Sequence, residues 1–393
     1  MRIIEVEACT IKVRGEATYM GDPEGNAQDV TDEYFRRPHF PILFARSTQS
    51  LLVKVTTEDG RVGWGEAQAP IAPEVPQAIV MHLLRPMLLG RDPHDVAVLW
   101  QEMFDGVRSR GHTTSFMLDA MAACDIALWD LRGQDTGLSI TQLLGGTYRT
   151  DVPVYVSGVP TAVAVEERVA IVRSWAEQGF SQVKLKLGMG IEQDVANVRA
   201  LRQALGREAG VMVDVHWRYN AAEALRLGQQ LEAMNVTFLE SPVWGEDLDG
   251  LAELAHALAL PIAAGEEYRT RYAFRDAFIR RAIDVPQPDV GRCGITELVR
   301  IASLAETFNL PCALHVGVGL GIYLAATIQV AAALPNFQIM EYQPLMHELG
   351  NRMLTAPLTC ADGHYRVPKG PGLGTAVDEG ALVRLGWTAA SAP

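Results

Sequence analysis

From about residue 151 to residue 343 the chain alternates short apolar segments with amphipathic segments, and this repeat constrains the fold more than any other feature. The segments between the apolar ones have helical periodicity, as in AVEERVAIVRSWAEQG. The predicted strands are VPVYVSG, QVKLKLG, GVMVDVHW, VTFLESPV, PIAAGE, DVPQPDV, PCALHV and FQIMEYQ. Eight strand–helix units in about 200 residues are what a parallel (β/α)8 barrel of the TIM type requires. A doubly wound open sheet is the structural alternative.

The residues before the repeat have a different pattern. IIEVEACTIKV and QSLLVKVTTEDGRVGWGEA predict antiparallel strands, and a helical pattern follows as far as Gly137. We therefore predict a small α+β domain over residues 1–140, the barrel over residues 141–350, and a C-terminal segment, residues 351–393, that packs back on the first domain. Residues 15–46 are polar and aromatic and predict a long binding loop.

Composition excludes several classes of protein. The 393 residues include 34 Lys plus Arg against 47 Asp plus Glu, a net charge of −13, which argues against a nucleic-acid or anionic-membrane surface. The chain has no long apolar run, and its start lacks the zones of a signal peptide, so we expect a soluble cytoplasmic protein. The five cysteines form no CxxC pair, which favours reduced thiols over disulfides or a zinc site.

Ionisable residues follow seven consecutive predicted strands, at or near the point where each strand ends. In a closed barrel the C-terminal strand ends meet at one rim, and enzymes with this fold build their active sites there. We therefore expect these side chains to face one mouth. They are Lys186, Asp214, Glu240, Glu266, Asp289, His315 and Glu341.

Three of these residues predict a metal site. Asp214, Glu240 and Glu266 end three successive apolar strands, which would bring three carboxylates together. One acid after a strand is most often a helix N-cap or a loop residue, but three at matching offsets favour a hard divalent cation, Mg²⁺ or Mn²⁺. Glu267 stands beside Glu266 and is an alternative third ligand. We favour Glu266 and interpret Glu267 as a residue that contacts either the metal ligands or the substrate.

Other residues at the rim predict proton transfer. Lys184 and Lys186 are two positions apart on one strand and so face the same side. His315 follows the strand after Asp289, whose carboxylate can fix the tautomer and basicity of the ring, as a general base requires. His216 lies two residues after the first predicted metal ligand and is interpreted as a general acid, with metal binding or pocket lining as alternatives.

Substrate contacts are predicted on two loops. Trp217 and Arg218 follow the predicted general acid and fit a polar, anionic ligand. Tyr19 and Arg46 belong to the long N-terminal loop and are further candidates.

These residues resemble the motifs of the enolase superfamily, and of its mandelate racemase subgroup, over essentially the whole chain. The matching segments are WGEA, CDIALWDLRGQDTGLSITQLLGG, KLKLG, VDVHW, LESPV, AAGE, QPDVGRCGI, LHVGVG and MEY. The resemblance implies that the N-terminal domain caps the barrel and sets specificity, and that the protein forms homo-oligomers, from dimers to octamers. It also implies roles for individual residues: Mg²⁺ ligands for Asp214, Glu240 and Glu266, a KxK base for Lys186, a His-Asp dyad for Asp289 and His315, and a hydrogen bond to the substrate carboxylate for Glu341.

One departure narrows the expected reaction. Mandelate racemase has Asn where this chain has His216, and an Asp-x-His arrangement resembles the acid-sugar dehydratases, such as the galactonate and mannonate enzymes. The resemblance thus implies a Mg²⁺-dependent hydro-lyase of carbohydrate acid catabolism. His315 would remove the α-proton, the metal would stabilise the enediolate, and His216 would protonate the leaving β-hydroxyl, giving a 2-keto-3-deoxy sugar acid. Lys184 and Lys186 would orient the anion, and Lys186 could instead be the base.

Three alternatives remain open from the sequence. Bases on both faces of a substrate suit a racemase or epimerase, and a cycloisomerase is also compatible. A non-catalytic barrel that binds sugar acids is the alternative from outside enzymology. The sequence does not identify which hexonate, pentonate or hexarate would be the substrate.

Overall fold

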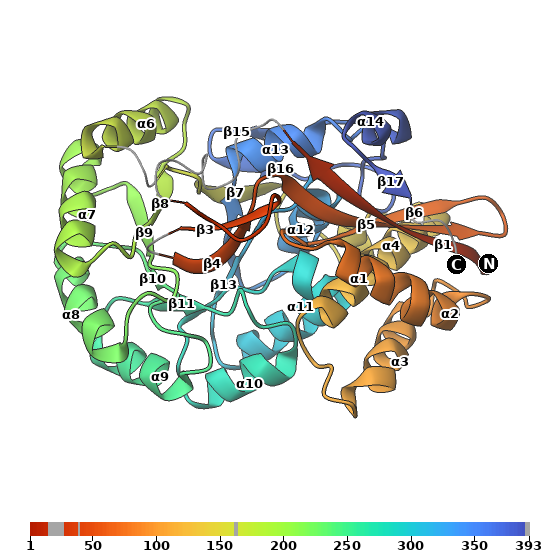
Figure 1. Cartoon of the computed structure of the whole chain (residues 1–393), viewed down its shortest axis with the longest axis horizontal. Coiled ribbons are helices and arrows are strands. Elements are labelled where there is room, and N and C mark those ends of the chain that lie inside the picture. Colours follow the sequence, from red (N-terminus) through yellow and green to blue (C-terminus); the bar gives the residue numbers. More distant parts are fainter. Residues whose placement is uncertain (15–26, 38–39, 161–163, 390–393) are drawn as a thin grey trace.

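A computed structural model of the chain describes residues 1–14, 27–37, 40–160 and 164–389. Its centre is a barrel of eight parallel strands hydrogen-bonded in the order β12-β11-β10-β9-β8-β7-β14-β13 (Figure 1). The first and last strands of the repeat, β7 and β14, are paired, and the backbone N–H of His315 donates to the carbonyl oxygen of Pro288 (3.2 Å) where β12 and β13 meet. The predicted (β/α)8 barrel is confirmed, and the doubly wound alternative is wrong, because strands that follow one another in sequence are neighbours around a nearly closed ring.

All eight predicted strands are present. They are β7 (Asp151–Val156), β8 (Gln182–Lys186), β9 (Gly210–Asp214), β10 (Leu239–Glu240), β11 (Ile262–Ala264), β12 (Val285–Pro286), β13 (Cys312–Leu314) and β14 (Phe337–Tyr342). Figure 1 shows the helices that follow these strands around the outside of the barrel. They are α6 (Val165–Glu177), α7 (Ile191–Leu205), α8 (Ala221–Glu232), α9 (Leu248–Ala257), α10 (Arg271–Ile279), α11 (Val290–Thr307), α12 (Gly321–Ala333) and α13 (Pro344–Asn351).

The barrel interior has an apolar layer directly below the polar residues. The layer is a cluster of buried side chains from seven of the strands or the residue beside them: Tyr155, Met212, Phe238, Ala263, Val285, Ala313 and Ile339. Because side chains on one face of a strand recur every second residue, the inward position above Met212 is Asp214, and the one above Phe238 is Glu240. The lining of the barrel interior therefore changes from apolar to charged between one inward-facing residue and the next along these strands.

The N-terminal domain is an antiparallel sheet covered by helices, as the sequence predicts. The sheet has the order β17-β1-β5-β6. Its strands are β1 (Ile3–Val13), β5 (Thr48–Thr57), β6 (Val62–Ala67) and β17 (Thr388–Ala389), and its helical segments are α1 (Glu74–Ile79), the π-helical turn η1 (Val80–Leu84), α2 (Arg85–Leu88), α3 (Val96–Arg108), α4 (Phe116–Thr136) and α5 (Ile140–Leu143). Gly137 ends α4 in a left-handed conformation (φ 70°), as predicted.

Two buried carboxylates of helix α4 join it to the barrel, to β6 and to the C-terminal segment. Asp125 accepts hydrogen bonds from the backbone N–H and hydroxyl of Thr296 on α11 (2.8 and 2.6 Å). Asp130 accepts from the backbone N–H groups of Trp64 on β6 and Leu373 in the C-terminal segment (3.1 and 3.0 Å). Burial raises the pKa of Asp125 to about 7 and that of Asp130 to about 6, and these N–H donors oppose the rise by stabilising the charged form.

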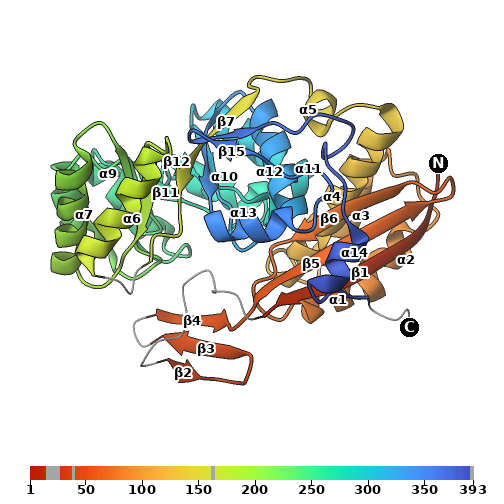
Figure 2. The same ribbon diagram turned by 90° about the horizontal axis from the view of Figure 1, so that it is seen from above.

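The region predicted as one long loop, residues 15–46, is partly regular structure. Its described residues form a small antiparallel sheet of β2 (Gln28–Asp29), β3 (Tyr34–Arg37) and β4 (Phe40–Ala45). Figure 1 shows β3 and β4 in front of the barrel strands, and Figure 2 shows the small sheet set apart on one side of the molecule. The prediction of an unstructured loop is corrected here, because Phe35 is fully buried and stacks on Phe44 across the β3–β4 pair (5.8 Å between ring centres).

The C-terminal segment contacts both parts of the molecule. After β15 (Cys360–Ala361), strand β16 (His364–Arg366) pairs with β7 of the barrel. Helix α14 (Glu379–Arg384) precedes β17, which pairs with β1 through Cys9 and Ala389 and so completes the N-terminal sheet. Within the described ranges, no helix combines the length and apolar character needed to cross a bilayer. All five cysteines are free.

Replacing Gly65 by Ala tests the contact between β6 and α4. A Cβ at Gly65 would collide with the backbone carbonyl of Ala123 on α4, which cannot move aside as a flexible side chain can. We expect Gly65→Ala to lower the free energy of unfolding by about 3 kcal/mol or more. Gly106→Ala is the control, because Gly106 is an exposed residue of α3 with room for a methyl group. Equal melting temperatures for the two variants would contradict this packing.

Candidate active site

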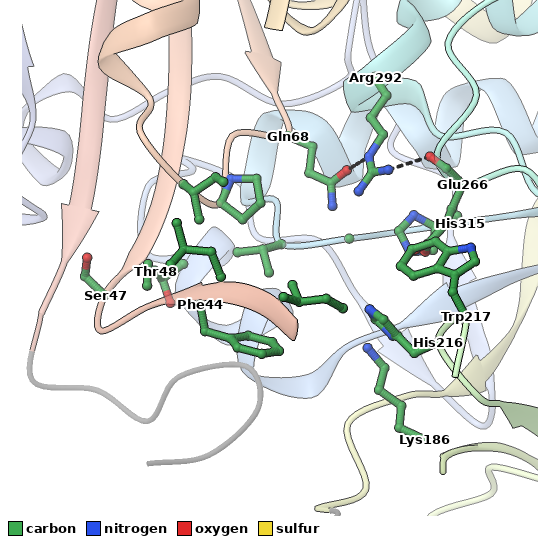
Figure 3. A pocket seen from close by; sticks show the side chains of 17 residues that line it. Phe44, Ser47, Thr48, Gln68, Lys186, His216, Trp217, Glu266, Arg292 and His315 are labelled. Atoms are coloured by element: carbon green, nitrogen blue, oxygen red, sulfur yellow. Dashed lines mark hydrogen bonds and ion pairs between the residues drawn. The ribbon is translucent and has the colours of Figure 1, made fainter. Parts of the chain in front are cut away.

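A cavity of about 220 Å³ lies at the C-terminal ends of the barrel strands (Figure 3). Five predicted site residues line it: Lys186, His216, Trp217, Glu266 and His315. They come from β8 and from the loops after β9, β11 and β13. In Figure 3 their side chains converge on one end of the cavity. The remaining predicted acids and Lys184 lie beneath this lining.

Lys184 is the cation at the centre of the buried layer. Its ammonium contacts Glu240 Oε1 (2.7 Å), Glu341 Oε1 (3.3 Å) and Asp214 Oδ2 (3.8 Å), and it lies over the ring of Tyr155 at 5.5 Å from the ring centre. The Lys184 side chain is 1 % exposed. One buried ammonium thus balances part of the charge of three buried carboxylates.

The pKa values of these groups follow from burial and from their neighbours. Burial acts to lower the pKa of Lys184, but the charges of Glu240 and Glu341 outweigh it and raise that pKa, so the ammonium stays charged. Burial acts to raise the pKa of Asp214, but Lys184 and the hydrogen bond with His216 lower it to about 2. Glu240 has the opposite balance, because burial and nearby carboxylates exceed the effect of Lys184 and raise its pKa to about 7.

His315 is held at both ring nitrogens. Its Nδ1 is 2.7 Å from Asp289 Oδ2, and its Nε2 is 2.5 Å from Glu266 Oε2 and 3.6 Å from Glu341 Oε2. Burial acts to lower the pKa of the ring, but the charge of Glu266 and the hydrogen bond with Asp289 outweigh it and raise the pKa to about 10. In this arrangement His315 is an imidazolium ion. Asp289 and His315 lie together as the sequence predicts.

A tyrosine and a glutamate that the sequence analysis did not identify support this pair. The hydroxyl of Tyr323 donates to Asp289 Oδ2 (2.7 Å) and accepts from the backbone N–H of Gly317 (2.9 Å). Tyr323 is in the first turn of α12, whose backbone N–H groups at Leu320 and Tyr323 donate to Glu66 of β6 (2.6 and 2.9 Å). Glu66 comes from the WGEA segment, so a carboxylate of the N-terminal domain caps a barrel helix at the site.

Polar residues near the strand ends complete the hydrogen bonding of the acids. Gln287 donates to Glu240 Oε2 (2.7 Å), and Gln343 donates to Glu341 Oε1 (3.3 Å). Both glutamines lie two residues from a predicted site residue, so the period of two was a signal that could have found them. Arg292 donates to the backbone carbonyl of Glu266 (2.6 Å) and is also hydrogen-bonded to Gln68 (Figure 3). No local pattern links Gln68 to the barrel.

The backbone is strained where the cavity is lined. His216 and Trp217 have φ values of 50° and 57°, in the left-handed region that residues other than glycine seldom adopt. The backbone N–H of His216 donates to Asp214 Oδ1 (2.9 Å), and its ring stands against the ring of Trp217 (4.7 Å between centres). These contacts hold two consecutive side chains at the cavity.

Three of the predicted substrate contacts, among the described residues, do not line the cavity. Arg46 pairs with Asp29 and covers the ring of Phe35, and Arg218 donates to the carbonyl of Gly188 (3.3 Å). Glu267 packs against Gly245, with both oxygens buried and unpaired among the described residues. Each of these three side chains takes a nearer partner or turns away from the cavity, and their role as substrate contacts stays a prediction. Tyr19 lies outside the described residues.

Three carboxylates at the strand ends are of the chemical type that binds a divalent cation. Asp214, Glu240 and Glu266 follow adjacent strands, and Glu240 is in direct register with Asp214 on one side and with Ala263 on the other. Carboxylate oxygens are the ligands that Mg²⁺ prefers. Within the described residues no three acidic, histidine or cysteine side chains form a ready coordination cluster. The carboxylates here contact Lys184, Gln287 and His315 instead, so the chemistry and register of the donors fit Mg²⁺, and binding it requires these contacts to be exchanged.

Two protein families match the chain. Residues 27–145 match the mandelate racemase / muconate lactonizing enzyme N-terminal domain, and residues 167–381 match the enolase C-terminal domain-like family. The D-galactarolactone cycloisomerase of Agrobacterium fabrum is 32 % identical over 85 % of this chain and 90 % of that protein. The D-galactonate dehydratase of Ralstonia pickettii is 32 % identical with the same coverage.

Solved structures agree with the family matches. A member of the enolase superfamily from Agrobacterium tumefaciens has a TM-score of 0.94 at 35 % identity, covering 99 % of both chains. A racemase from Streptomyces coelicolor A3(2) with bound magnesium has a TM-score of 0.84 at 26 % identity, covering 98 % of this chain and 99 % of that one. The chain belongs to the enolase superfamily, in its mandelate racemase subgroup. It is thus an enzyme of a family whose members include sugar-acid dehydratases, and the non-catalytic barrel is not retained.

Removing the Lys184 charge tests how the buried acids are balanced. In Lys184→Met the side chain keeps its length but leaves Asp214, Glu240 and Glu341 without their shared ammonium. We expect the free energy of unfolding in the presence of EDTA to fall by about 3 kcal/mol or more, because buried charges lose their partner. Lys369→Met is the control, since Lys369 is exposed, and it should change stability by less than about 0.5 kcal/mol. Similar urea midpoints for both variants would refute the role of Lys184.

Proposed function

We propose that the protein is a Mg²⁺-dependent acid-sugar dehydratase, which converts a sugar acid into a 2-keto-3-deoxy acid. The observation that carries the proposal is that His216 and His315 line one cavity from different strand ends, with Lys186 beside them. Elimination of water needs a base at the α-carbon and an acid at the β-oxygen, and two histidines at one end of the cavity can supply both. The similarity to a D-galactonate dehydratase supports the same reaction class.

Asp214, Glu240 and Glu266 would hold the metal ion. When bound, Mg²⁺ supplies positive charge that acidifies the α-proton of a coordinated carboxylic acid. Engagement of Glu266 as a ligand would take it away from His315 Nε2, which it contacts at 2.5 Å. The ring nitrogen that faces the cavity would then be available as a base, while Asp289 keeps its hold on Nδ1.

The protein's own residues then move two protons. His315 Nε2 takes the proton from the α-carbon, and the electrons of that C–H bond form the new C=C bond as the β-carbon–oxygen bond breaks. His216 donates a proton to the departing hydroxyl, which leaves as water. The enol that remains tautomerises to the 2-keto-3-deoxy acid. Lys186, which lines the cavity, and the buried Lys184, which contacts the acids beneath it, would stabilise the negative charge that develops on the substrate.

A second candidate is 1,1-proton transfer or cycloisomerisation. The observation that favours it is that Lys186 lines the same cavity as His315, so the site holds two candidate bases. The relative named D-galactarolactone cycloisomerase is as similar to the chain as the dehydratase. The substrate and product together distinguish the candidates. Elimination from an open-chain acid releases water and yields a 2-keto-3-deoxy acid, 1,1-proton transfer returns an acid with its hydroxyls intact, and cycloisomerisation gives a product of the same mass as its cyclic substrate.

A screen of sugar acids tests the proposal. Purified protein with Mg²⁺ is incubated with aldonic and aldaric acids of varied configuration, and 2-keto acid is detected as its semicarbazone. We expect one or a few acids to give product, and His315→Asn to lower kcat by about 100-fold or more. His364→Asn is the control, since that histidine is exposed. Full turnover by His315→Asn would remove His315 from the mechanism, and racemised or isomerised products alone would select the second candidate.

The metal ligands are tested by chelation and by one isosteric substitution. EDTA should abolish turnover and added Mg²⁺ should restore it. Glu240→Gln keeps the shape of the side chain but removes a charged ligand, and we expect its apparent affinity for Mg²⁺ to fall about tenfold or more. Glu348→Gln, at an exposed position of α13, should leave the affinity unchanged. Full activity in EDTA would exclude a metal-dependent mechanism.

A further inference from the structure

The cavity has two chemically different ends. In Figure 3, Lys186, His216, Glu266 and His315 lie at one end, and Phe44 lies toward the other. Of the described residues that line the cavity, seven are aliphatic, aromatic or proline residues from β4 and from the loops after β6 and β13: Ile42, Leu43, Phe44, Ala45, Pro70, Ile71 and Val318. The hydroxyls of Ser47 and Thr48 are the neutral polar groups on that side.

Among the described residues, the charged groups that line the cavity are at the catalytic end. The described Lys and Arg side chains in the lining are Lys186 and Arg292, and Arg292 is already hydrogen-bonded to Gln68 and to the carbonyl of Glu266. Arg46, next to this wall in sequence, pairs with Asp29. Arg37 lies over the ring of Phe44, 5.8 Å from its centre, and is not in the lining.

This division restricts the substrate. A carboxylate placed against the apolar wall would lose its hydration and find no lining cation to pair with, whereas a methyl group or the edge of a ring would be buried favourably. The metal-binding end needs only one carboxylate. We propose that the substrate is a monocarboxylic acid whose end farthest from the reacting carbons presents C–H surface, in the form of a methyl group or a ring edge, and that diacids are excluded. This inference rests on the proposed function and deepens it.

Two unreactive probes of equal chain length test the inference without knowledge of sugar configuration. 2-Hydroxyhexanoate and 2-hydroxyadipate share the carboxylate and hydroxyl that would face the metal, and they differ only in ending with methyl or carboxylate. With Mg²⁺ present, calorimetry should give a Kd at least about tenfold lower for 2-hydroxyhexanoate. Equal or tighter binding of 2-hydroxyadipate would overturn the inference, whatever the outcome of the turnover screen.

Turnover of sugar acids shows whether the far end of the preferred substrate is a methyl group or a ring edge. D-Fuconate, D-galactonate and D-galactarate share their configuration and end in methyl, hydroxymethyl and carboxylate, and 3,6-anhydro-D-galactonate presents a ring edge. The same terminal series is repeated in the gluco and manno configurations. We expect kcat/KM to be highest for the methyl or anhydro acid and at least about 100-fold lower for the diacid. Preference for a diacid overturns this inference but leaves the proposed dehydratase unaffected. In the anhydro acid the oxygen on carbon 3 belongs to the ring, so elimination opens the ring without releasing water. Absence of 2-keto acid from every open-chain compound therefore defeats the dehydratase and leaves the calorimetric ranking to decide the inference.

A charge introduced into the apolar wall should reverse the preference. Phe44→Arg places a cation at the far end, and the ratio of the two Kd values should shift at least about tenfold toward 2-hydroxyadipate. Ile71→Arg is a second variant, because Phe44 also packs on Phe35 and its loss can unfold the small sheet. The control is Val30→Arg, at a position between β2 and β3 that is 48 % exposed and outside the lining. A folded Phe44→Arg or Ile71→Arg with an unchanged ratio contradicts the inference.

Discussion

The contact of Lys184 with three buried carboxylates is the interaction on which the site depends. Asp214, Glu240 and Glu341 are each less than 5 % exposed, and their ammonium partner is equally buried. Without a cation, like charges in a barrel interior would repel one another and lose their hydration. Lys184 supplies this balancing positive charge at the boundary between the apolar layer and the cavity. Its ammonium allows the three carboxylates to be buried close together in the folded chain.

A second constraint is that the N-terminal domain both lines the cavity and supports the residues that hold His315. Glu66 caps α12, Tyr323 on that helix reaches Asp289, and Asp289 holds the ring of His315. Asp125 and Asp130 fasten α4 to the barrel and to the C-terminal segment at the same interface. The small sheet of β2, β3 and β4 provides the apolar wall of the cavity through β4. One domain thereby supports the pair formed by Asp289 and His315 and shapes the far end of the cavity.

The sequence predicted what depends on periodicity. The strand–helix repeat predicted the barrel, and the residue near the end of each strand predicted that Lys186, His216, Glu266 and His315 would meet, because parallel strands end at one rim. The sequence did not predict contacts between distant segments, because nothing near Glu66 or Gln68 in sequence indicates their partners on α12 and α11. The side chains of Arg46, Arg218 and Glu267 lie away from the cavity, because side-chain direction depends on local partners, such as Asp29 for Arg46. The domain boundaries and residue roles stay predictions.

In the proposed reaction, His315 removes the α-proton of the substrate and the β-hydroxyl of the same molecule is lost as water. The most direct measurement is the fate of solvent deuterium, followed by proton NMR of a reaction run in D₂O with an acid that the enzyme consumes. For elimination of water we expect a 2-keto acid with one deuterium at carbon 3, because the enol takes up a deuteron there from the solvent. Recovery of an acid with its hydroxyls intact and deuterium at carbon 2 would contradict it.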